Sequence, residues 1–341
     1  LILCALTICR NSLWSQGAAL WKDAVEKAGN KGRIYINLGT SLIGEGATFE
    51  AAKAFDQALK KGLPDALASI TLYDAGLLLQ KMGDLSKAEK YYRSALERDP
   101  TNIRAHNNLG AILLAKGELE ESEKELKAAG LSKSYASLGM LYELQGKTKE
   151  AEEGFLKAIS MNPSLKDIHY MFGGFLMRAG RREEAIYYFK EAVRRDPGDA
   201  LVLNSLGNAL LEEKMVDEAI SYLKRALHID NDLAPAHNNL GLAYFKQGKP
   251  EDAMKEITRA IELSPNHADF HNNLGAVLYS QGKEQAALKE YREALSLMPC
   301  FSGAHNNMGI FYQDKKMYPR AISEFRKAVQ CDAYYYRALY G

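Results

Sequence analysis

The chain lacks the features that mark several common classes of protein. Its 341 residues include only four cysteines, which are too few and too widely spaced for a disulfide framework or a zinc cluster. An excess of one charge is also missing, since 44 lysines and arginines stand against 43 acidic residues. Electrostatic binding of nucleic acid needs a clustered positive excess. The sequence therefore predicts no nucleic-acid partner.

Long apolar runs are equally scarce. The one candidate, residues 1–9, has about half of the roughly 20 residues that a membrane-spanning helix needs. Because the chain begins with Leu1 rather than methionine, we expect a fragment or a processed product. Two interpretations stay open for residues 1–12: a buried or signal-derived stub, or the end of a membrane segment that begins before Leu1.

Familiar catalytic motifs are absent too. The sequence has no G-x-S-x-G, no phosphate-binding loop and no H-E-x-x-H. Asp230-Asn231-Asp232 matches the D-x-D pattern that many sugar transferases use to hold a metal-bound nucleotide. It falls in an expected turn, however, where Asp and Asn are ordinary residues. We predict no catalytic residue and no cofactor in this segment.

What the sequence does contain is a repeat, marked by one recurring glycine. From Gly139 onward the markers are evenly spaced at thirty-four residues, and the three earlier steps are thirty-seven, thirty-four and twenty-nine. The markers are Gly39, Gly76, Gly110, Gly139, Gly173, Gly207, Gly241, Gly275 and Gly309. A fixed period of this length is typical of a repeat architecture.

Other residues keep the same period. Alanine or serine lies twelve residues after each marker, a large apolar residue sixteen after, and alanine nineteen after. Small residues let two helices approach closely, and large residues fill the space beside them. A second glycine seven residues after most markers ends the first helix, and proline often closes the second. Each unit is therefore predicted to be a helical hairpin that buries its apolar face by stacking on its neighbours.

This pattern resembles the tetratricopeptide repeat family over residues 32–335, as nine units. The resemblance implies an all-α fold, a right-handed superhelical solenoid of helical hairpins. We expect residues 13–31 to form a half repeat that caps the N-terminal end, and residues 336–341 to be a truncated tail. The resemblance says little about function, because the fold serves many kinds of binding protein.

One unit is shorter than the others. The step from Gly110 to Gly139 is five residues below the usual period. The second helix of this unit, near residues 119–129, should therefore lose about one turn or its connecting turn. A local change of superhelix curvature is expected there.

Asparagine recurs two and three residues before many markers, where the family's first helices line a concave groove. An Asn amide both donates and accepts hydrogen bonds, so a row of them can hold the backbone of an extended peptide. The row resembles the asparagine ladder of the intracellular O-linked N-acetylglucosamine transferases. The predicted peptide-binding residues are Asn37, Asn108, Asn204, Asn238, Asn239, Asn272, Asn273, Asn306, Asn307, Phe245 and Tyr279. The alternative is that the amides bridge adjacent helices or bind water.

Histidine recurs four residues before five markers, as His106, His169, His237, His271 and His305. Helices of successive units lie about 10 Å apart. A metal ion needs ligands at about 2 Å. We therefore expect these side chains to pack between units, and we predict no metal site.

The front end resembles a second family. Cys9-Arg10-Asn11-Ser12-Leu13-Trp14 and Leu20-Trp21-Lys22-Asp23-Ala24-Val25 precede the repeats in an order similar to the membrane junction of protein O-mannosyltransferase-like glycosyltransferases with tetratricopeptide tails. That resemblance implies a membrane anchor and repeats in a periplasm or lumen that recognise a protein substrate. Its catalytic residues would precede Leu1, so whether the full-length protein is an enzyme stays open. The alternative is a non-enzymatic assembly scaffold, anchored or cytoplasmic, that self-associates through its end repeats.

Overall fold

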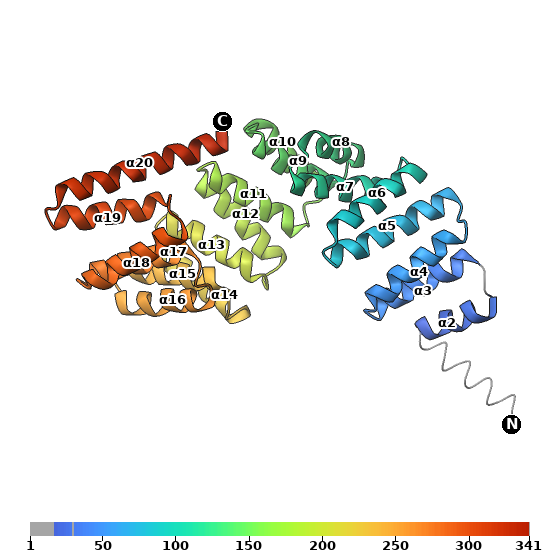
Figure 1. Cartoon of the computed structure of the whole chain (residues 1–341), viewed down its shortest axis with the longest axis horizontal. Coiled ribbons are helices and arrows are strands. Elements are labelled where there is room, and N and C mark those ends of the chain that lie inside the picture. Colours follow the sequence, from blue (N-terminus) through green and yellow to red (C-terminus); the bar gives the residue numbers. More distant parts are fainter. Residues whose placement is uncertain (1–16, 29–30, 341) are drawn as a thin grey trace, which may run out of the picture. The chain divides into compact units, whose positions relative to one another are not determined.

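The computed structural model describes the backbone of residues 17–28 and 31–340 and the side chains of residues 17–27 and 31–331. Within these ranges every regular element is an α-helix, which confirms the predicted all-α solenoid of helical hairpins (Figure 1). The membrane segment predicted for residues 1–12 lies outside the described part. Among the described helices, none combines the length and apolar character that crossing a membrane requires.

The chain divides into two units, residues 1–162 and 163–341. The helices of unit 1 are α2 (Gly17–Ala28), α3 (Gly32–Gly44), α4 (Thr48–Lys60), α5 (Asp65–Lys81), α6 (Leu85–Arg98), α7 (Ile103–Lys116), α8 (Leu119–Ala129), α9 (Ser132–Leu144) and α10 (Thr148–Met161). Those of unit 2 are α11 (Lys166–Arg178), α12 (Arg182–Arg195), α13 (Ala200–Glu212), α14 (Val216–Ile229), α15 (Ala234–Lys246), α16 (Pro250–Leu263), α17 (Ala268–Ser280), α18 (Glu284–Leu297), α19 (Ser302–Asp314) and α20 (Tyr318–Tyr340). From α3 onward, odd-numbered helices are first helices and even-numbered helices are second helices.

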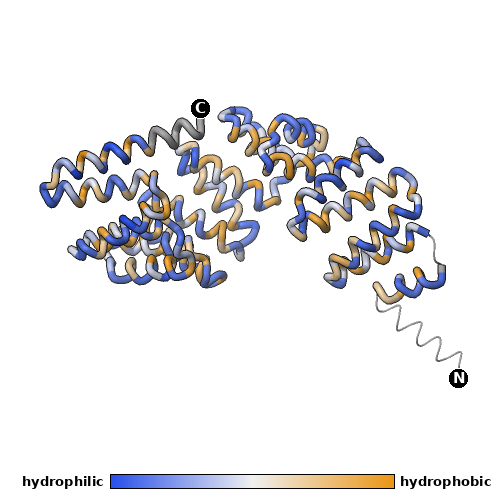
Figure 2. The backbone as a smooth tube through the Cα atoms, in the orientation of Figure 1, coloured by the Kyte–Doolittle hydropathy of each residue, from blue (hydrophilic) through white to orange (hydrophobic). Residues whose placement is uncertain are grey.

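The marker glycines bring the two helices of a hairpin together. A Cβ atom at Gly275 would lie 2.6 Å from the Tyr291 ring, and one at Gly207 would lie 2.6 Å from Leu223. Real Cβ atoms do not approach other atoms so closely, so the large residue sixteen positions later fills the space that the glycine leaves. Apolar residues are interspersed with polar ones along every helix, as helices with one buried face require (Figure 2).

The turn between the helices of a hairpin uses a left-handed backbone. Gly248 and Gly282 have φ values of 77° and 70° there, which glycine adopts without strain. Two units have lysine at this position: Lys214 with φ 61° and Lys316 with φ 60°. The turn therefore keeps its geometry where the glycine is missing, at a conformational cost to the lysine.

The short unit is shortened where the sequence predicts. Its second helix, α8, has 11 residues, whereas the next second helix, α10, has 14. Gly130 ends α8 in a left-handed conformation with φ 59°, and α9 begins at Ser132. The loss of about one turn is thus confirmed. The accompanying change of curvature stays a prediction.

The described ends of the helix array differ in how they are covered. At the first end, α2 packs on α3, with Ala18 buried against Leu38 and Leu42 and with Trp21 beside them. The Ala18 N–H also donates to Glu45 Oε1 at 2.9 Å. At the other end, the second helix of the last hairpin, α20, continues through residue 340.

Candidate peptide-binding face

The asparagines of unit 2 join successive first helices through their side chains. Nδ2 of Asn239 donates to Oδ1 of Asn204 at 3.0 Å. The same bond runs from Asn273 to Asn238 and from Asn307 to Asn272, each at 2.9 Å. The amide two residues before one marker is therefore bonded to the amide three residues before the previous marker. The structure places the amides in the bridging role that the sequence left open as the alternative.

In two of the three bridges the accepting asparagine is more deeply buried than the donating one, while Asn204 and Asn239 are both half-buried. Asn238 and Asn272, which accept the bridging bonds, are buried and face away from solvent. Asn239, Asn273 and Asn307 are only half-buried. Each uses one Nδ2 hydrogen in its bridge, and no described residue bonds the Oδ1 atoms of Asn273 and Asn307. Asn273 and Asn307 therefore retain a donor and a free acceptor for a ligand backbone, whereas Oδ1 of Asn239 already accepts from Nδ2 of Asn238 at 3.3 Å and has one lone pair left.

The remaining predicted residues do not extend this row evenly. Asn37 lies exposed on α3. Asn108 on α7 donates to the hydroxyl of Tyr92, a residue of the preceding hairpin, at 3.1 Å. Phe245 is half-buried and packs in the cluster around Ile257 and Val277. Among the described residues of unit 1, therefore, no asparagine side chain bonds an asparagine of a neighbouring repeat; Asn107 accepts instead from the Ser134 hydroxyl at 2.8 Å.

Tyr279 is attached to the neighbouring first helix. Its hydroxyl donates to Oδ2 of Asp314 at 2.5 Å, and its ring lies 5.7 Å from that of Phe311. Burial, and next the Asp314 carboxylate, raise the pKa of Tyr279 to about 12. Tyr279 therefore supplies a fixed aromatic wall beside the amides, with its hydroxyl already occupied.

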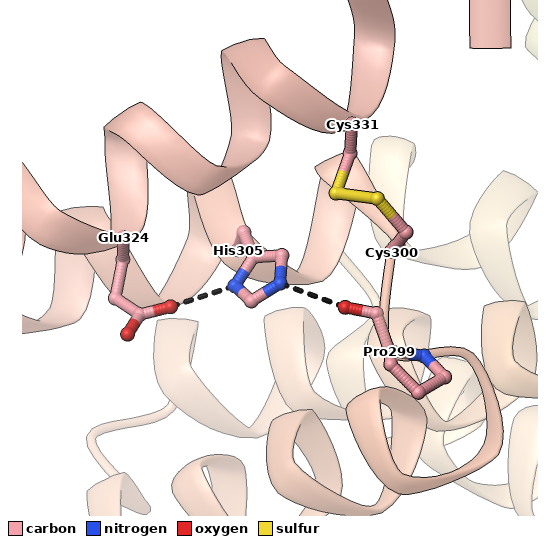
Figure 3. Close-up of a disulfide and its surroundings, with 5 residues drawn as sticks. All are labelled: Pro299, Cys300, His305, Glu324 and Cys331. Atoms are coloured by element: carbon pink, nitrogen blue, oxygen red, sulfur yellow. Dashed lines mark hydrogen bonds and ion pairs between the residues drawn. A yellow bond between two sulfur atoms is a disulfide. The ribbon is translucent and has the colours of Figure 1, made fainter. Parts of the chain in front are cut away.

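Four of the five recurrent histidines are held between a carboxylate and a backbone carbonyl. Nδ1 contacts a glutamate 19 residues later, and Nε2 contacts a carbonyl six residues earlier; for His271 the distances are 2.7 Å to Glu290 and 2.9 Å to Pro265 O. The other pairs are His106 with Glu125, His237 with Glu256, and His305 with Glu324. Figure 3 shows the last of them, with Pro299 as the carbonyl partner. Sequence reasoning predicted packing here but missed the glutamate, which keeps the period of the markers in the last three hairpins.

The bonding pattern fixes the protons on these imidazoles. A carbonyl only accepts, so Nε2 must carry a hydrogen. Nδ1 faces a carboxylate, so a second proton lies between the ring and the glutamate. His169 is the exception: Tyr188 stacks on it at 6.0 Å in place of a glutamate, and its Nδ1 is buried without a hydrogen-bond partner. Burial lowers the pKa of His169, which favours a neutral ring.

Comparison with known proteins agrees with the repeated helical hairpins of the structure. Models described as tetratricopeptide repeat match residues 73–136, 132–165, 167–199 and 238–305, and one described as TPR repeat matches residues 207–248. The chain belongs to the tetratricopeptide repeat family. Together these matches account for most of the hairpins from α5 to α18.

Relatives of this tetratricopeptide repeat chain share only part of their length with it. Human tetratricopeptide repeat protein 7B is 28% identical over 156 residues, which are 44% of this chain and 16% of that protein. The photosystem I assembly protein Ycf3 of Cyanophora paradoxa is 32% identical over 105 residues, 31% of this chain and 61% of that protein. In the solved Cut9–Hcn1 complex, a chain that is 16% identical aligns with a TM-score of 0.59, covering 94% of this chain and 82% of its own. That last likeness shows the fold alone.

The D-x-D sequence forms an ordinary connection between two repeats. The Asp232 N–H donates to Oδ1 of Asp230 at 3.1 Å, and Arg259 pairs with Asp232 at 3.1 Å. Among the residues that the structure describes, no cluster of three or more His, Cys, Asp or Glu side chains lies close enough to hold a metal ion. The Asp residues thus serve as turn formers and an ion-pair partner.

A disulfide that the sequence did not reveal joins Cys300 and Cys331 (Figure 3). The bridge links the turn before α19 to the second half of α20, 31 residues away. A single disulfide is compatible with the low cysteine count, which excludes only a framework of several disulfides. The sequence did not predict this pairing. It fastens the start of α19 to the second half of α20 within the last hairpin of the repeat array.

Proposed function

We propose that this tetratricopeptide repeat chain is a protein-interaction scaffold that holds an extended segment of a partner across the first helices α15, α17 and α19. The observation that carries the proposal is the row formed by Asn239, Asn273 and Asn307. Each outer amide is fixed in orientation by its bond to the preceding repeat. A fixed amide loses little conformational entropy when it binds a ligand backbone.

The chemistry of the face suits backbone recognition. A free carboxamide Oδ1 accepts from a peptide N–H, and the second Nδ2 hydrogen donates to a peptide C=O. Phe245 and Tyr279 add apolar surface beside the amides. Such a face binds extended segments with limited regard to their side chains. The assembly role in the name of the Ycf3 relative agrees with a scaffold of this kind.

The inter-repeat bonds decide how the proposal is tested. Replacing Asn273 by Ala would remove the bond to buried Asn238 and destabilise the fold, so loss of binding alone would be ambiguous. A random peptide library is therefore selected on the intact wild-type chain. Selected peptides are then titrated while the side-chain amide NMR signals of Asn239, Asn273 and Asn307 are followed.

Selected peptides are expected to shift these three signals together and to tolerate alanine at most of their side chains. N-methylation of the peptide backbone should weaken binding more than any alanine does. Peptides that leave all three amide signals in place, while binding elsewhere, would refute the proposal.

The front end of the sequence also predicts that this chain is the extracytoplasmic recognition region of a membrane-anchored, glycosyltransferase-like protein. Its sequence signs lie mostly in residues 1–16, outside the described part. A long apolar stretch encoded upstream of Leu1, with acidic residues in its first loop, is the expected result, together with repeats in a periplasm or lumen. A start codon directly before Leu1 would leave the non-enzymatic scaffold.

A further inference from the structure

The Cys300–Cys331 bridge presents its two cysteines unequally to solvent (Figure 3). Cys300 lies in the turn before α19 and is exposed, whereas Cys331 on α20 is buried, with 7% of its surface exposed. Thiol–disulfide exchange requires the entering sulfur to contact one sulfur of the bond, so its rate depends on access. A thiol therefore reaches this bridge from the Cys300 side.

The exposure of Cys300 belongs to the geometry of the repeat. The residue nine before a marker is exposed in each of the four preceding units as well: Ser164, Gly198, Asp232 and Asn266. A further repeat follows each of these residues, and it does not cover them. The exposure of Cys300 therefore does not depend on its place in the last described hairpin.

A pocket of about 410 Å³ opens directly onto the bridge. Its walls come from the turn before α19, the first turn of α19 and the second half of α20: Pro299, Cys300, His305, Lys327, Gln330 and Cys331. Sites for small molecules have volumes of roughly 300 to 1,000 Å³. The pocket is therefore large enough to hold a small thiol beside the two sulfur atoms.

Positive charge is in excess among the described groups at this pocket. Glu324 contacts Nδ1 of His305 at 2.6 Å and accepts from Nζ of Lys327 at 2.8 Å. The second imidazole proton balances the carboxylate, so the Lys327 ammonium remains as the net charge. Lys327 lies one helical turn before Cys331 on the same helix. Since a nearby cation stabilises a thiolate, Lys327 favours both an entering thiolate and one formed on Cys331.

The turn that carries Cys300 is also held by a contact that needs no disulfide. The Pro299 carbonyl, which belongs to the peptide bond before Cys300, accepts from Nε2 of His305 at 3.0 Å (Figure 3). The same contact, from His271 to Pro265 at 2.9 Å, holds the turn before α17, where no cysteine is present. Opening the bridge therefore leaves the two cysteines in place to rejoin.

We propose that the Cys300–Cys331 bridge is a reversible thiol-exchange site whose substrate is a small anionic thiol. The thiolate enters the pocket and forms a bond to Sγ of Cys300. The bond between Cys300 and Cys331 breaks, and its electron pair leaves on Sγ of Cys331, which then takes a proton from water. The entering thiol is oxidised to a mixed disulfide with Cys300 as Cys331 is reduced. Return attack by the Cys331 thiolate restores the bridge and releases the thiol.

The attacked sulfur is identified in the intact chain with Cys4 and Cys9 replaced by serine, so that Cys300 and Cys331 are the only cysteines. The oxidised protein is mixed with excess 2-mercaptoethanesulfonate, quenched with acid at intervals and mapped by peptide mass spectrometry. The early product is expected to carry the probe on Cys300 and a free thiol on Cys331. A probe found mainly on Cys331 would overturn the proposal.

The dependence of the rate on thiol concentration separates direct attack from local unfolding. Direct attack on an exposed sulfur predicts a rate that rises in proportion to the thiolate concentration. The rate should also stay within about tenfold of that for the urea-unfolded chain. A rate that levels off at high thiol concentration would show that the bridge reacts only after the hairpin opens, which contradicts an exchange site in the folded protein. A folded bridge that does not react contradicts it equally.

The charge of the thiol tests the part played by Lys327. Relative to their thiolate rates with the urea-unfolded chain, 2-mercaptoethanesulfonate should react about fivefold faster than cysteamine, which carries an ammonium group. High salt should remove this preference. Lys327→Gln should remove it too, whereas Lys60→Gln, at an exposed lysine of unit 1, makes the same charge change and should preserve it. Equal relative rates for the two thiols in the wild type would refute selection of an anionic thiol.

Discussion

Replacing Glu290 by Leu tests the histidine–glutamate pair most directly. Glu290 accepts from Nδ1 of His271 at 2.7 Å, and the imidazole is almost fully buried. Leucine keeps apolar contacts but leaves Nδ1 without an acceptor. A hydrogen bond that involves a charged group contributes about 1.5 to 3 kcal/mol, so we expect a loss of about 2 kcal/mol in the free energy of unfolding.

The protein supplies its own control for this substitution. Tyr188 stands where a glutamate is found beside the other histidines, and His169 there still bonds its carbonyl at 2.9 Å. Glu290→Tyr should therefore cost less than Glu290→Leu, because the ring covers a neutral imidazole. The double variant His271→Phe with Glu290→Leu should recover part of the loss, since removing both partners leaves no polar group unpaired.

Urea denaturation followed by circular dichroism measures the global effect. Hydrogen exchange of the α17 and α18 amides measures the local effect, because a repeat array need not unfold in one step. Equal stability of the wild type and Glu290→Leu would refute the structural role of the pair. So would a double variant whose loss equals the sum of the two single losses.

Three further expectations follow from other positions. Lys214→Gly should raise the unfolding midpoint by the equivalent of about 1 kcal/mol, because glycine adopts the left-handed turn without strain; an unchanged midpoint in urea would contradict this. Burial raises the pKa of Glu324, but hydrogen bonds from Lys327 and the adjacent histidine outweigh it and leave the pKa lowered. These hydrogen bonds stabilise the fold at pH values above the pKa that Glu324 has in the unfolded chain, and the stabilisation is lost as the pH falls through its lower pKa in the folded state. Glu324→Gln should therefore flatten the acid limb of a profile of melting temperature against pH. Reducing the Cys300–Cys331 bridge removes a 31-residue cross-link and should cost up to about 3 to 4 kcal/mol in the last hairpin, seen as faster hydrogen exchange in α20 but not in α12.

The repeat architecture could be predicted because its physical cause is local in the sequence. Tyr291 follows Gly275 by sixteen positions, and the pair recurs at one spacing, so hairpin packing follows from the period. The shortening of α8 could be predicted for the same reason, because the step from Gly110 to Gly139 is five residues shorter than the period.

The candidate site was less predictable because the period gives spacing but not contact. Asn272 and Asn273 are adjacent in the sequence, yet one is buried and accepts a bond while the other stays half-exposed. Which amide faces solvent depends on the rotation of successive hairpins. Cys300 and Cys331 have no counterparts in other units, so no period pointed to their pairing.

The same disulfide changes what a single cut in the backbone would do. Cys300 and Cys331 enclose the exposed turn that contains Lys315 and Lys316. Trypsin cleavage at these lysines would leave both fragments covalently joined, so a nicked chain would migrate as intact until a reductant is added. The last hairpin would then keep its helices in register after losing the peptide bond that connects them.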